Sequence, residues 1–219
     1  METQSERLAA IEKKEAELNA REAELRKNEI DLDYDNKKPN FPPLIHLIYH
    51  NITEEIPIAK QAFVRTAFIA FIVFVVSLLL NIISCCTVGT MENSSVSLGY
   101  NIVFSVIYLA LGTVLCFQLN YFRLYTMAKS NDIGVSWIIF QVALVLFCAY
   151  LAVGFNDSGS VGVITMIDMF SKSTSSFAKV LAIITSVVLL GSAVFEVFVM
   201  IRGFTVFKSS AVPSRSFGI

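Results

Sequence analysis

Charged residues are scarce in this sequence. Only 16% of its residues are Asp, Glu, Lys or Arg, whereas 55% are hydrophobic and the mean hydropathy is +0.64. This composition excludes a protein whose whole surface faces water. The first 65 residues carry 10 Lys or Arg and 13 Asp or Glu. The other 154 residues carry only 7 Lys or Arg and 5 Asp or Glu, so the two regions suit different solvents. With a net charge of -1 and no concentrated basic face, nucleic acid is excluded as a partner.

The residue patterns that enzymes use are also missing. The two histidines, His46 and His50, lie four positions apart, but no Glu stands between them and no third ligand is near. No Gly-rich phosphate loop follows a strand pattern, and Glu92, Asp157 and Asp168 are scattered carboxylates. We therefore expect no catalytic site, no bound metal and no cofactor.

The four cysteines, Cys85, Cys86, Cys116 and Cys148, fall within or at the end of apolar runs. Their spacing contains no Cys-x-x-Cys pair, so we expect thiols packed as small apolar residues and no disulfide framework. Palmitate on Cys85 and Cys86 would require a cytosolic helix end. The orientation argued below places them at the opposite end.

Four long runs with almost no charge dominate the chain after Arg65. Each is about as long as the ~20 residues that cross a bilayer as a helix. The first lies too far along the chain to be a signal peptide. The runs predict an all-α integral membrane protein with a transmembrane domain at 66–205 and spans at about 66–88, 98–120, 133–155 and 180–201.

Lys and Arg flank these spans mainly on one side. They precede the first span, separate the second from the third and follow the fourth: Lys60, Arg65, Arg123, Lys129, Arg202, Lys208 and Arg215. Because cytosolic loops carry excess positive charge, we expect both termini and the central loop in the cytosol, although Lys172 and Lys179 fit less well. Asn93 and Asn156 begin glycosylation sequons in the loops expected on the lumenal or extracellular side.

Residues 1–38 form a charged arm rich in helix-favouring Ala, Glu and Leu. A seven-residue repeat aligns Ile11, Leu18, Leu25 and Leu32, but the second core position of each heptad is polar or charged. One apolar position per heptad makes a weak coiled-coil seam, so a homo-oligomer and a solvated single helix both stay open. At the other end, residues 206–219 are expected to form a short cytosolic tail.

Residues 39–65 connect the arm to the first span. Pro39, Pro42 and Pro43 prevent helix and favour a stiff, extended connection. Residues 45–65 then mix aromatic, aliphatic and charged side chains, a composition typical of the membrane interface.

Three motifs in this segment resemble the juxtamembrane signature of secretory carrier-associated membrane proteins: Asn40-Phe41-Pro42-Pro43, Tyr49-His50-Asn51-Ile52 and Glu54-Glu55-Ile56-Pro57. The likeness continues through Ser158-Gly159 in the third loop to Ile201-Arg202-Gly203. The resemblance implies a membrane-trafficking protein that supports vesicle transport, exocytosis and endocytic recycling. It also implies residence in the trans-Golgi network, secretory vesicles, endosomes and plasma membrane, with cytosolic trafficking proteins bound through the arm.

Three departures limit this resemblance. No Asn-Pro-Phe occurs, so adaptors with Eps15-homology domains are not supported as partners, and Phe41 replaces the usual Trp. The family's central loop carries a Trp-Tyr-Arg-Pro-like peptide implicated in membrane fusion. The matching stretch here keeps the aromatic and basic character without the Trp and the Pro: Tyr121, Phe122, Arg123, Leu124, Tyr125 and Lys129.

The same stretch predicts membrane contact on physical grounds. Aromatic rings prefer the interface, and each cation near an anionic leaflet contributes about 1 kcal/mol. We therefore expect Tyr121 to Lys129 to lie on the membrane, either as an anionic-lipid or fusion element or as an ordinary anchor.

Glu196 is the one ionisable residue inside a predicted span. An intramembrane carboxylate indicates function by default, which gives the alternative of a small transporter or channel component. Its position near Arg202 favours a structural role, in which Glu196 snorkels or bonds to a partner such as Gln118. Asn81 and Gln141 are predicted to form interhelical hydrogen bonds.

Overall fold

The computed structural model describes residues 14–15, 17–18, 21, 39–41, 49–90, 97–130, 135–172 and 175–210. Pro42, Pro43, His46 and Asn93 lie outside these ranges, as do most heptad positions and residues 211–219. The chain divides into two units, residues 1–51 and residues 52–219.

In the first unit, the described arm residues are helical and exposed: Lys14, Glu15, Glu17, Leu18 and Arg21. Leu18, at the repeated apolar position, is 61% exposed, and the homo-oligomer stays a prediction. Asn40 pairs with the backbone of His50 in both directions. Its Oδ1 accepts the His50 N–H at 2.7 Å, and its Nδ2 donates to the His50 carbonyl at 3.0 Å. The first motif asparagine thus joins the two sides of the segment that holds Pro42 and Pro43.

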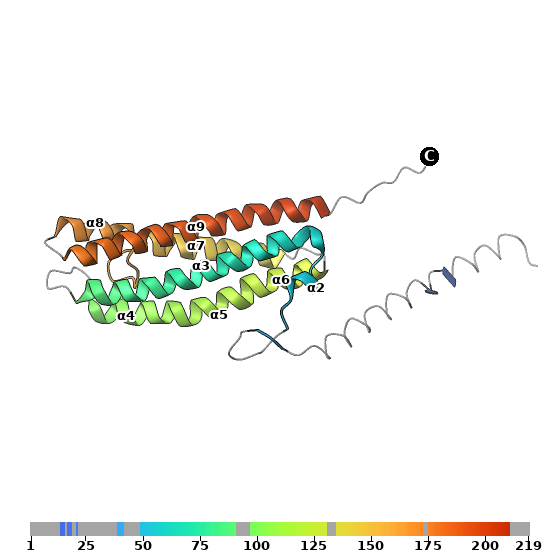
Figure 1. Ribbon diagram of the computed structural model, residues 1–219, viewed down its shortest axis with the longest axis horizontal. Coiled ribbons are helices and arrows are strands. Elements are labelled where there is room, and N and C mark those ends of the chain that lie inside the picture. The colour runs from blue at the N-terminus through green and yellow to red at the C-terminus, as the bar shows by residue number, and fades with distance from the viewer. Residues whose placement is uncertain are drawn as a thin grey trace, which may run out of the picture. The chain divides into compact units, whose positions relative to one another are not determined.

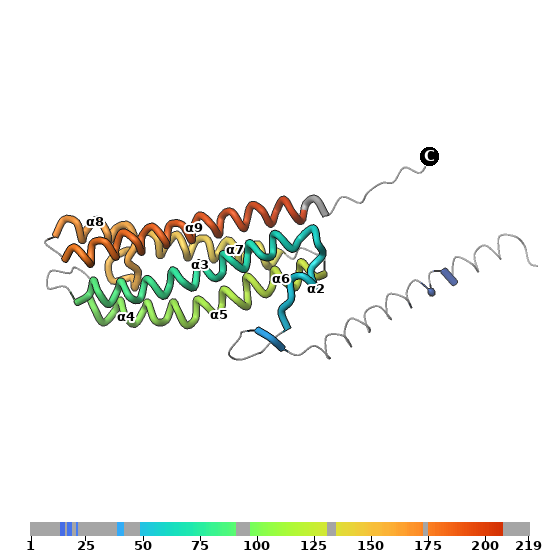
Figure 2. Tube along the Cα trace, viewed as in Figure 1, coloured from blue at the N-terminus to red at the C-terminus, as the bar shows by residue number. Residues whose placement is uncertain are grey.

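The second unit is a bundle of long helices, as Figure 1 shows. It begins with the short α2 (Ile52–Glu55) and the long α3 (Ile58–Gly89). A second continuous helix, which can be followed in Figure 2, contains α4 (Leu98–Ile107), η1 (Tyr108–Gly112), α5 (Thr113–Leu115), η2 (Cys116–Tyr121) and α6 (Phe122–Ser130). Both η segments are π-helical. The remaining helices are α7 (Val135–Val153), α8 (Val163–Ser171) and α9 (Ser176–Ser210).

Four helices are long and apolar enough to cross a membrane: Ile58–Gly89, Leu98–Ser130, Val135–Val153 and Ser176–Phe207. They confirm the predicted all-α fold with four spans. The second helix continues to Ser130 and α9 to Ser210, beyond the predicted ends at 120 and 201, because neither stretch contains a proline. The short α8 was not predicted.

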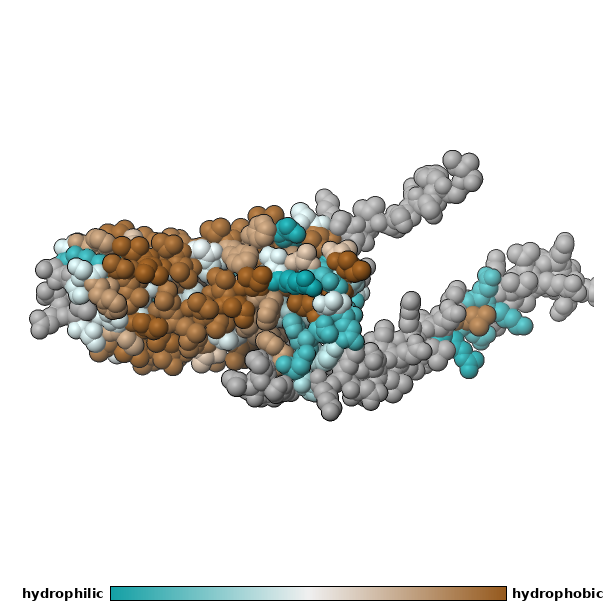
Figure 3. All heavy atoms as spheres, viewed as in Figure 1, coloured by the Kyte–Doolittle hydropathy of each residue, from teal (hydrophilic) through white to brown (hydrophobic). Residues whose placement is uncertain are grey.

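Hydrophobic side chains cover the outside of the bundle. Large apolar residues remain exposed along every span, among them Ile69, Leu111, Leu146 and Val194. Figure 3 shows them as a broad brown band, with hydrophilic side chains gathered mainly near α2. Helices that are apolar on all sides suit a lipid environment.

The interior buries small and polar residues as well as large apolar ones. α3 and α9 share the largest helix interface, and α3 buries Ala67 and Ala70 while α9 buries Ala178 and Ala182. Small residues let helix backbones approach closely where lipid supplies no hydrophobic driving force.

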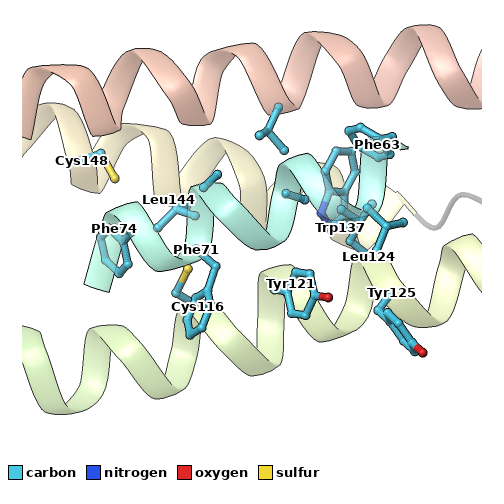
Figure 4. Close-up of a cluster of buried hydrophobic side chains, with 14 of the residues drawn as sticks. Phe63, Phe71, Phe74, Cys116, Tyr121, Leu124, Tyr125, Trp137, Leu144 and Cys148 are labelled. Atoms are coloured by element: carbon cyan, nitrogen blue, oxygen red, sulfur yellow. The ribbon is translucent and has the colours of Figure 1, made fainter. Parts of the chain in front are cut away.

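Trp137 belongs to the buried hydrophobic cluster and lies beside Phe63 (Figure 4). Its side chain is fully buried. A Cβ on Gly203 of α9 would lie 2.5 Å from Cη2 of Trp137 and 3.3 Å from Cζ of Phe63. Glycine at position 203 therefore makes room for the indole ring.

Candidate functional site

The two ends of the bundle differ in charge. We call the end formed by α2, α6 and the last turns of α9 the α2 end, and the opposite end the α8 end (Figure 1). Within the second unit, the α2 end carries most of the described cations, among them Lys60, Arg65, Arg123, Lys129 and Arg202. Lys172 and Lys179 lie at the α8 end. This asymmetry underlies the predicted orientation, which stays a prediction.

Glu55 forms the centre of the candidate site at the α2 end. Its carboxylate accepts hydrogen bonds from the Tyr125 hydroxyl and, at 2.9 Å, from Nζ of Lys129. The Glu55 side chain is only 3% exposed, whereas that of Lys129 is 32% exposed. The juxtamembrane motif and the fusion-linked segment, some 70 residues apart, therefore meet at one buried carboxylate.

The residues around Glu55 fix α2 against the first span. Ile56 is buried in the core, and Pro57 immediately precedes α3 as its N-cap residue, with a backbone φ of -52° and ψ of 138°. Nε2 of Gln61 donates to the carbonyls of Thr53 at 3.0 Å and Ile56 at 2.9 Å, which satisfies acceptors that α2 leaves unpaired. Each residue of Glu55-Ile56-Pro57 thus has a distinct structural role.

The segment from Tyr121 to Lys129 is helix, so the expected loop between the second and third spans is wrong here, while contact of this segment with the membrane surface stays a prediction. Four of its side chains are buried: Tyr121, Leu124, Tyr125 and Ala128. The stretch contains no Gly or Pro to end the second helix, and its apolar face packs on α3. Phe122 and Arg123 are only partly buried, and the Arg123 guanidinium lies 5.3 Å from the centre of the Phe140 ring.

Tyr121 connects the second helix to α3, and Tyr125 packs beside it. The Tyr121 ring lies 5.1 Å from that of Phe68 and 6.1 Å from that of Phe71, both on α3. Tyr121 and Tyr125 are themselves 6.4 Å apart. Because aromatic rings at 4.5–7 Å attract each other, this layer holds the Tyr125 hydroxyl in reach of Glu55.

Glu196 is buried in the bundle and does not snorkel. It is 3% exposed, and its Oε2 accepts a hydrogen bond from Nε2 of Gln141 at 2.9 Å. Oε1 of Gln141 in turn accepts from Nδ2 of Asn120 at 2.6 Å. The predicted partner Gln118 is wrong because that side chain faces outwards. The interhelical role predicted for Gln141 is confirmed, since it joins the second helix to α9.

At the α8 end, the segment from Ser158 to Gly162 folds into the bundle and is buried. Asn81 holds its backbone, donating to the Gly159 carbonyl at 2.7 Å and accepting the Val161 N–H at 2.9 Å. Asn101 accepts the Gly159 N–H at 2.9 Å. Asn81 therefore bonds to a loop, where an interhelical bond was predicted. Asn101 and Asn120 were missed, although they lie in uncharged runs as Asn81 and Gln141 do.

The sequon at Asn156 lies in a tight turn beside this loop. Asn156 is exposed, but Ser158 is 8% exposed and its N–H donates to the Phe155 carbonyl at 3.2 Å. Asp157 between them adopts a positive φ of 58°. Glycosylation at Asn156 stays a prediction, as it does at Asn93.

All four cysteines are free thiols. Cys85, Cys116 and Cys148 are buried, and Cys86 is partly buried. They occupy packed positions inside the helices, in agreement with their role as small apolar residues.

These features define an all-α integral membrane protein with four spans. A family model of the SCAMP family matches residues 38–210. The chain belongs to this family of secretory carrier-associated membrane proteins.

The chain is similar to secretory carrier-associated membrane proteins of plants and animals. It is 29% identical over 172 residues to secretory carrier-associated membrane protein 4 of Arabidopsis thaliana, which covers 75% of this chain and 62% of the relative. It is 30% identical over 143 residues to secretory carrier-associated membrane protein 1 of Oryza sativa subsp. japonica, covering 63% of this chain and 45% of the relative. It is 23% identical over 180 residues to secretory carrier-associated membrane protein 4 of Bos taurus, which covers 80% of this chain and 76% of the relative.

The chain thus spans about half to two thirds of the length of its plant relatives. No solved structure matches it.

Proposed function

We propose that this protein acts in membrane trafficking on post-Golgi secretory and endosomal carriers, where it supports vesicle transport, exocytosis and endocytic recycling. Membership of a family named for secretory carriers supports this proposal. The implied locations are the trans-Golgi network, secretory vesicles, endosomes and the plasma membrane. The role is non-enzymatic, and it uses the arm and the α2 end.

The contact between Glu55, Tyr125 and Lys129 carries the proposal. Glu55 belongs to the juxtamembrane motif, and Tyr125 and Lys129 belong to the segment that resembles the family's fusion-linked peptide. A movement of the segment before α2 would therefore be passed to α6 through one carboxylate. In this mechanism the arm binds cytosolic trafficking proteins, and α6 presents Phe122 and Arg123 to lipid headgroups.

Replacing the carboxylate tests this mechanism. Glu55→Gln and Lys129→Gln should both slow cargo delivery at unchanged vesicle abundance, and the charge exchange of Glu55→Lys with Lys129→Glu should restore part of the rate. Glu54→Gln changes the exposed neighbouring carboxylate and serves as the matched control. Normal delivery in both single variants, at matched expression, would refute a role for this contact.

The proposed orientation places both termini and the α2 end in the cytosol. The cations of the α2 end support it, because positive charge is retained on the cytosolic side. Protease added to sealed vesicles with the cytosolic face outward should remove tags from both ends. A protected tag at either end would overturn the orientation.

The alternative function, a small transporter or channel component, would use Glu196. Its buried carboxylate connects through Gln141 to Asn120 across three spans, which is the one observation in its favour. A transporter predicts a solute flux in reconstituted vesicles that Glu196→Gln abolishes. The trafficking proposal predicts no such flux.

A further inference from the structure

An apolar cleft opens between the second helix and α7, towards the lipid. Its volume is about 280 Å³, near the lower end of ligand-sized pockets. Leucines of the second helix and apolar residues of α7 line its two walls: Leu111, Leu115, Leu119, Phe140, Ala143 and Phe147. Leu111 and Leu115 are 58% and 52% exposed, so the cleft is accessible from the bilayer.

The cleft exists because the two helices separate along part of their length. α7 packs against η2, whereas α5 and η1 lie further from it. Gly112 has no side chain at this place, where a Cβ would make ordinary contacts with Cδ1 of Leu78 at 3.5 Å, Cζ of Phe74 at 3.7 Å and Cε1 of Phe147 at 3.9 Å. Phe74 of α3 closes the floor. The result is a long, narrow space open on one side.

The dimensions of the cleft suit a hydrocarbon chain. From Ile107 to Asn120 it follows the second helix for roughly 20 Å, at 1.5 Å per residue. One leaflet of the hydrocarbon core is about 15 Å deep, half of the full ~30 Å. Water is a poor occupant because a buried water needs several polar partners. An acyl chain that enters from the leaflet at the α2 end would fill the cleft.

A cation lies at the mouth of the cleft at the α2 end. Arg123 follows Asn120 by three residues, and its guanidinium lies over the ring of Phe140, which lines the cleft. The contact with the ring orients the guanidinium. The fork of an Arg side chain binds phosphate oxygens in bidentate geometry. Lys129, by contrast, is engaged with Glu55.

We propose that the cleft between the second helix and α7 holds one acyl chain of a phospholipid whose phosphate binds Arg123. The charged mouth and the apolar groove together complement the two parts of such a lipid. This inference goes beyond the trafficking role and does not depend on it.

Photo-cross-linking tests the proposal on the purified full-length chain in phosphatidylcholine vesicles. The probe is an anionic phospholipid with a diazirine in the middle of one acyl chain, and labelled positions are found by mass spectrometry. Labels should concentrate on Leu111, Leu115 and Ala143 above a similarly exposed lipid-facing residue outside the cleft, such as Leu146. Ala143→Phe fills the cleft, so labelling there should fall roughly tenfold because several methylene groups lose their burial site.

Ala110→Phe is the matched control, because Ala110 is exposed on the same helix and does not line the cleft. It should leave the labelling unchanged. Arg123→Gln should lower the labelling without altering the cleft, which keeps the proposal testable if Ala143→Phe fails to fold.

Three results would overturn the assignment. Labels spread evenly over all lipid-facing residues would show that the cleft has no preferred occupant. Equal labelling by a diazirine fatty acid, insensitive to Arg123→Gln, would exclude the phospholipid headgroup. Cross-links to another protein chain from a photoreactive amino acid placed at position 143 would show that a second copy fills the cleft.

Discussion

The two ends of the bundle are held together by different chemistry. At the α2 end, a charged side chain from the juxtamembrane segment meets charged and aromatic side chains of α6. At the α8 end, the neutral amides of Asn81 and Asn101 hold the backbone of a buried loop. The ion pair at the α2 end keeps one partly exposed member, Lys129 at 32%, so it responds to salt and nearby charge, whereas buried amide contacts do not. We therefore expect the α8 end to respond less to its surroundings than the α2 end, which under the proposed function is the part that a partner or a lipid surface would adjust.

The largest loss of stability is expected when the hydrogen bonds of Asn81 at the α8 end are removed. Asn81→Leu removes both bonds to the loop and leaves the Gly159 carbonyl and the Val161 N–H buried without a partner, at about 1–3 kcal/mol each. The melting temperature of the protein in detergent should fall steeply. Gln118→Leu, which changes an exposed amide of the second helix, should leave it almost unchanged. Equal melting temperatures of the two variants would contradict a stabilising role for the two hydrogen bonds of Asn81.

A smaller loss is expected in the packing of the α2 end. Gly203→Ala places a methyl group against Trp137 and should lower stability by about 1–3 kcal/mol. Gly191→Ala is the control on the same helix, since nothing lies within 4 Å of its Cβ position. Replacing this glycine should stabilise α9 slightly, by up to about 1 kcal/mol. In thermal unfolding, the melting temperature should fall for Gly203→Ala and rise slightly for Gly191→Ala.

Removing the charge at Glu55 should have a local effect of about 1 kcal/mol, the order of a partly exposed ion pair. Hydrogen exchange at the backbone amides of α2 should become faster in Glu55→Gln, while exchange at Val161 stays unchanged. High salt should bring the wild-type protein closer to the variant. Faster exchange at both ends would show that the ends are not independent.

Deletion of residues 1–38 should have the smallest effect on the bundle. The arm has one apolar position per heptad, too few to bury against a large surface. The melting temperature of the four-span unit should stay within error, while the binding of cytosolic partners is lost. Aggregation of the shortened protein on synthesis would show that the arm supports the fold.

The sequence predicted the helices far better than their contacts. Runs without charge are long enough to identify four spans, because a bilayer imposes their length and composition. The runs do not show which face of a helix turns inwards, since the spans are apolar on nearly all sides. For this reason the burial of Glu196 among Gln141 and Asn120 was missed, and Gln118 was chosen as its partner.

The α2 end shows the same limit. The residues Glu55, Tyr125 and Lys129 were all recognised, yet nothing in their spacing brings them together. Their meeting depends on how α2 turns at Pro57 and how far the second helix continues. The charge of the segment from Tyr121 to Lys129 suggested a loop bound to lipid. The segment is helix because its apolar face packs on α3.

The π-helical segments of the second helix set its rotational register. Each π turn accommodates one extra residue, which rotates everything after it by about 100° relative to an uninterrupted α-helix. Tyr125 and Lys129 face Glu55 only with η1 and η2 in place before them. Deleting the exposed Gln118 would keep the span apolar and long enough to cross the membrane, yet turn α6 away from α2. The alignment of α6 with α2 is thus set by the number of residues in the second helix as well as by the chemistry of Glu55, Tyr125 and Lys129.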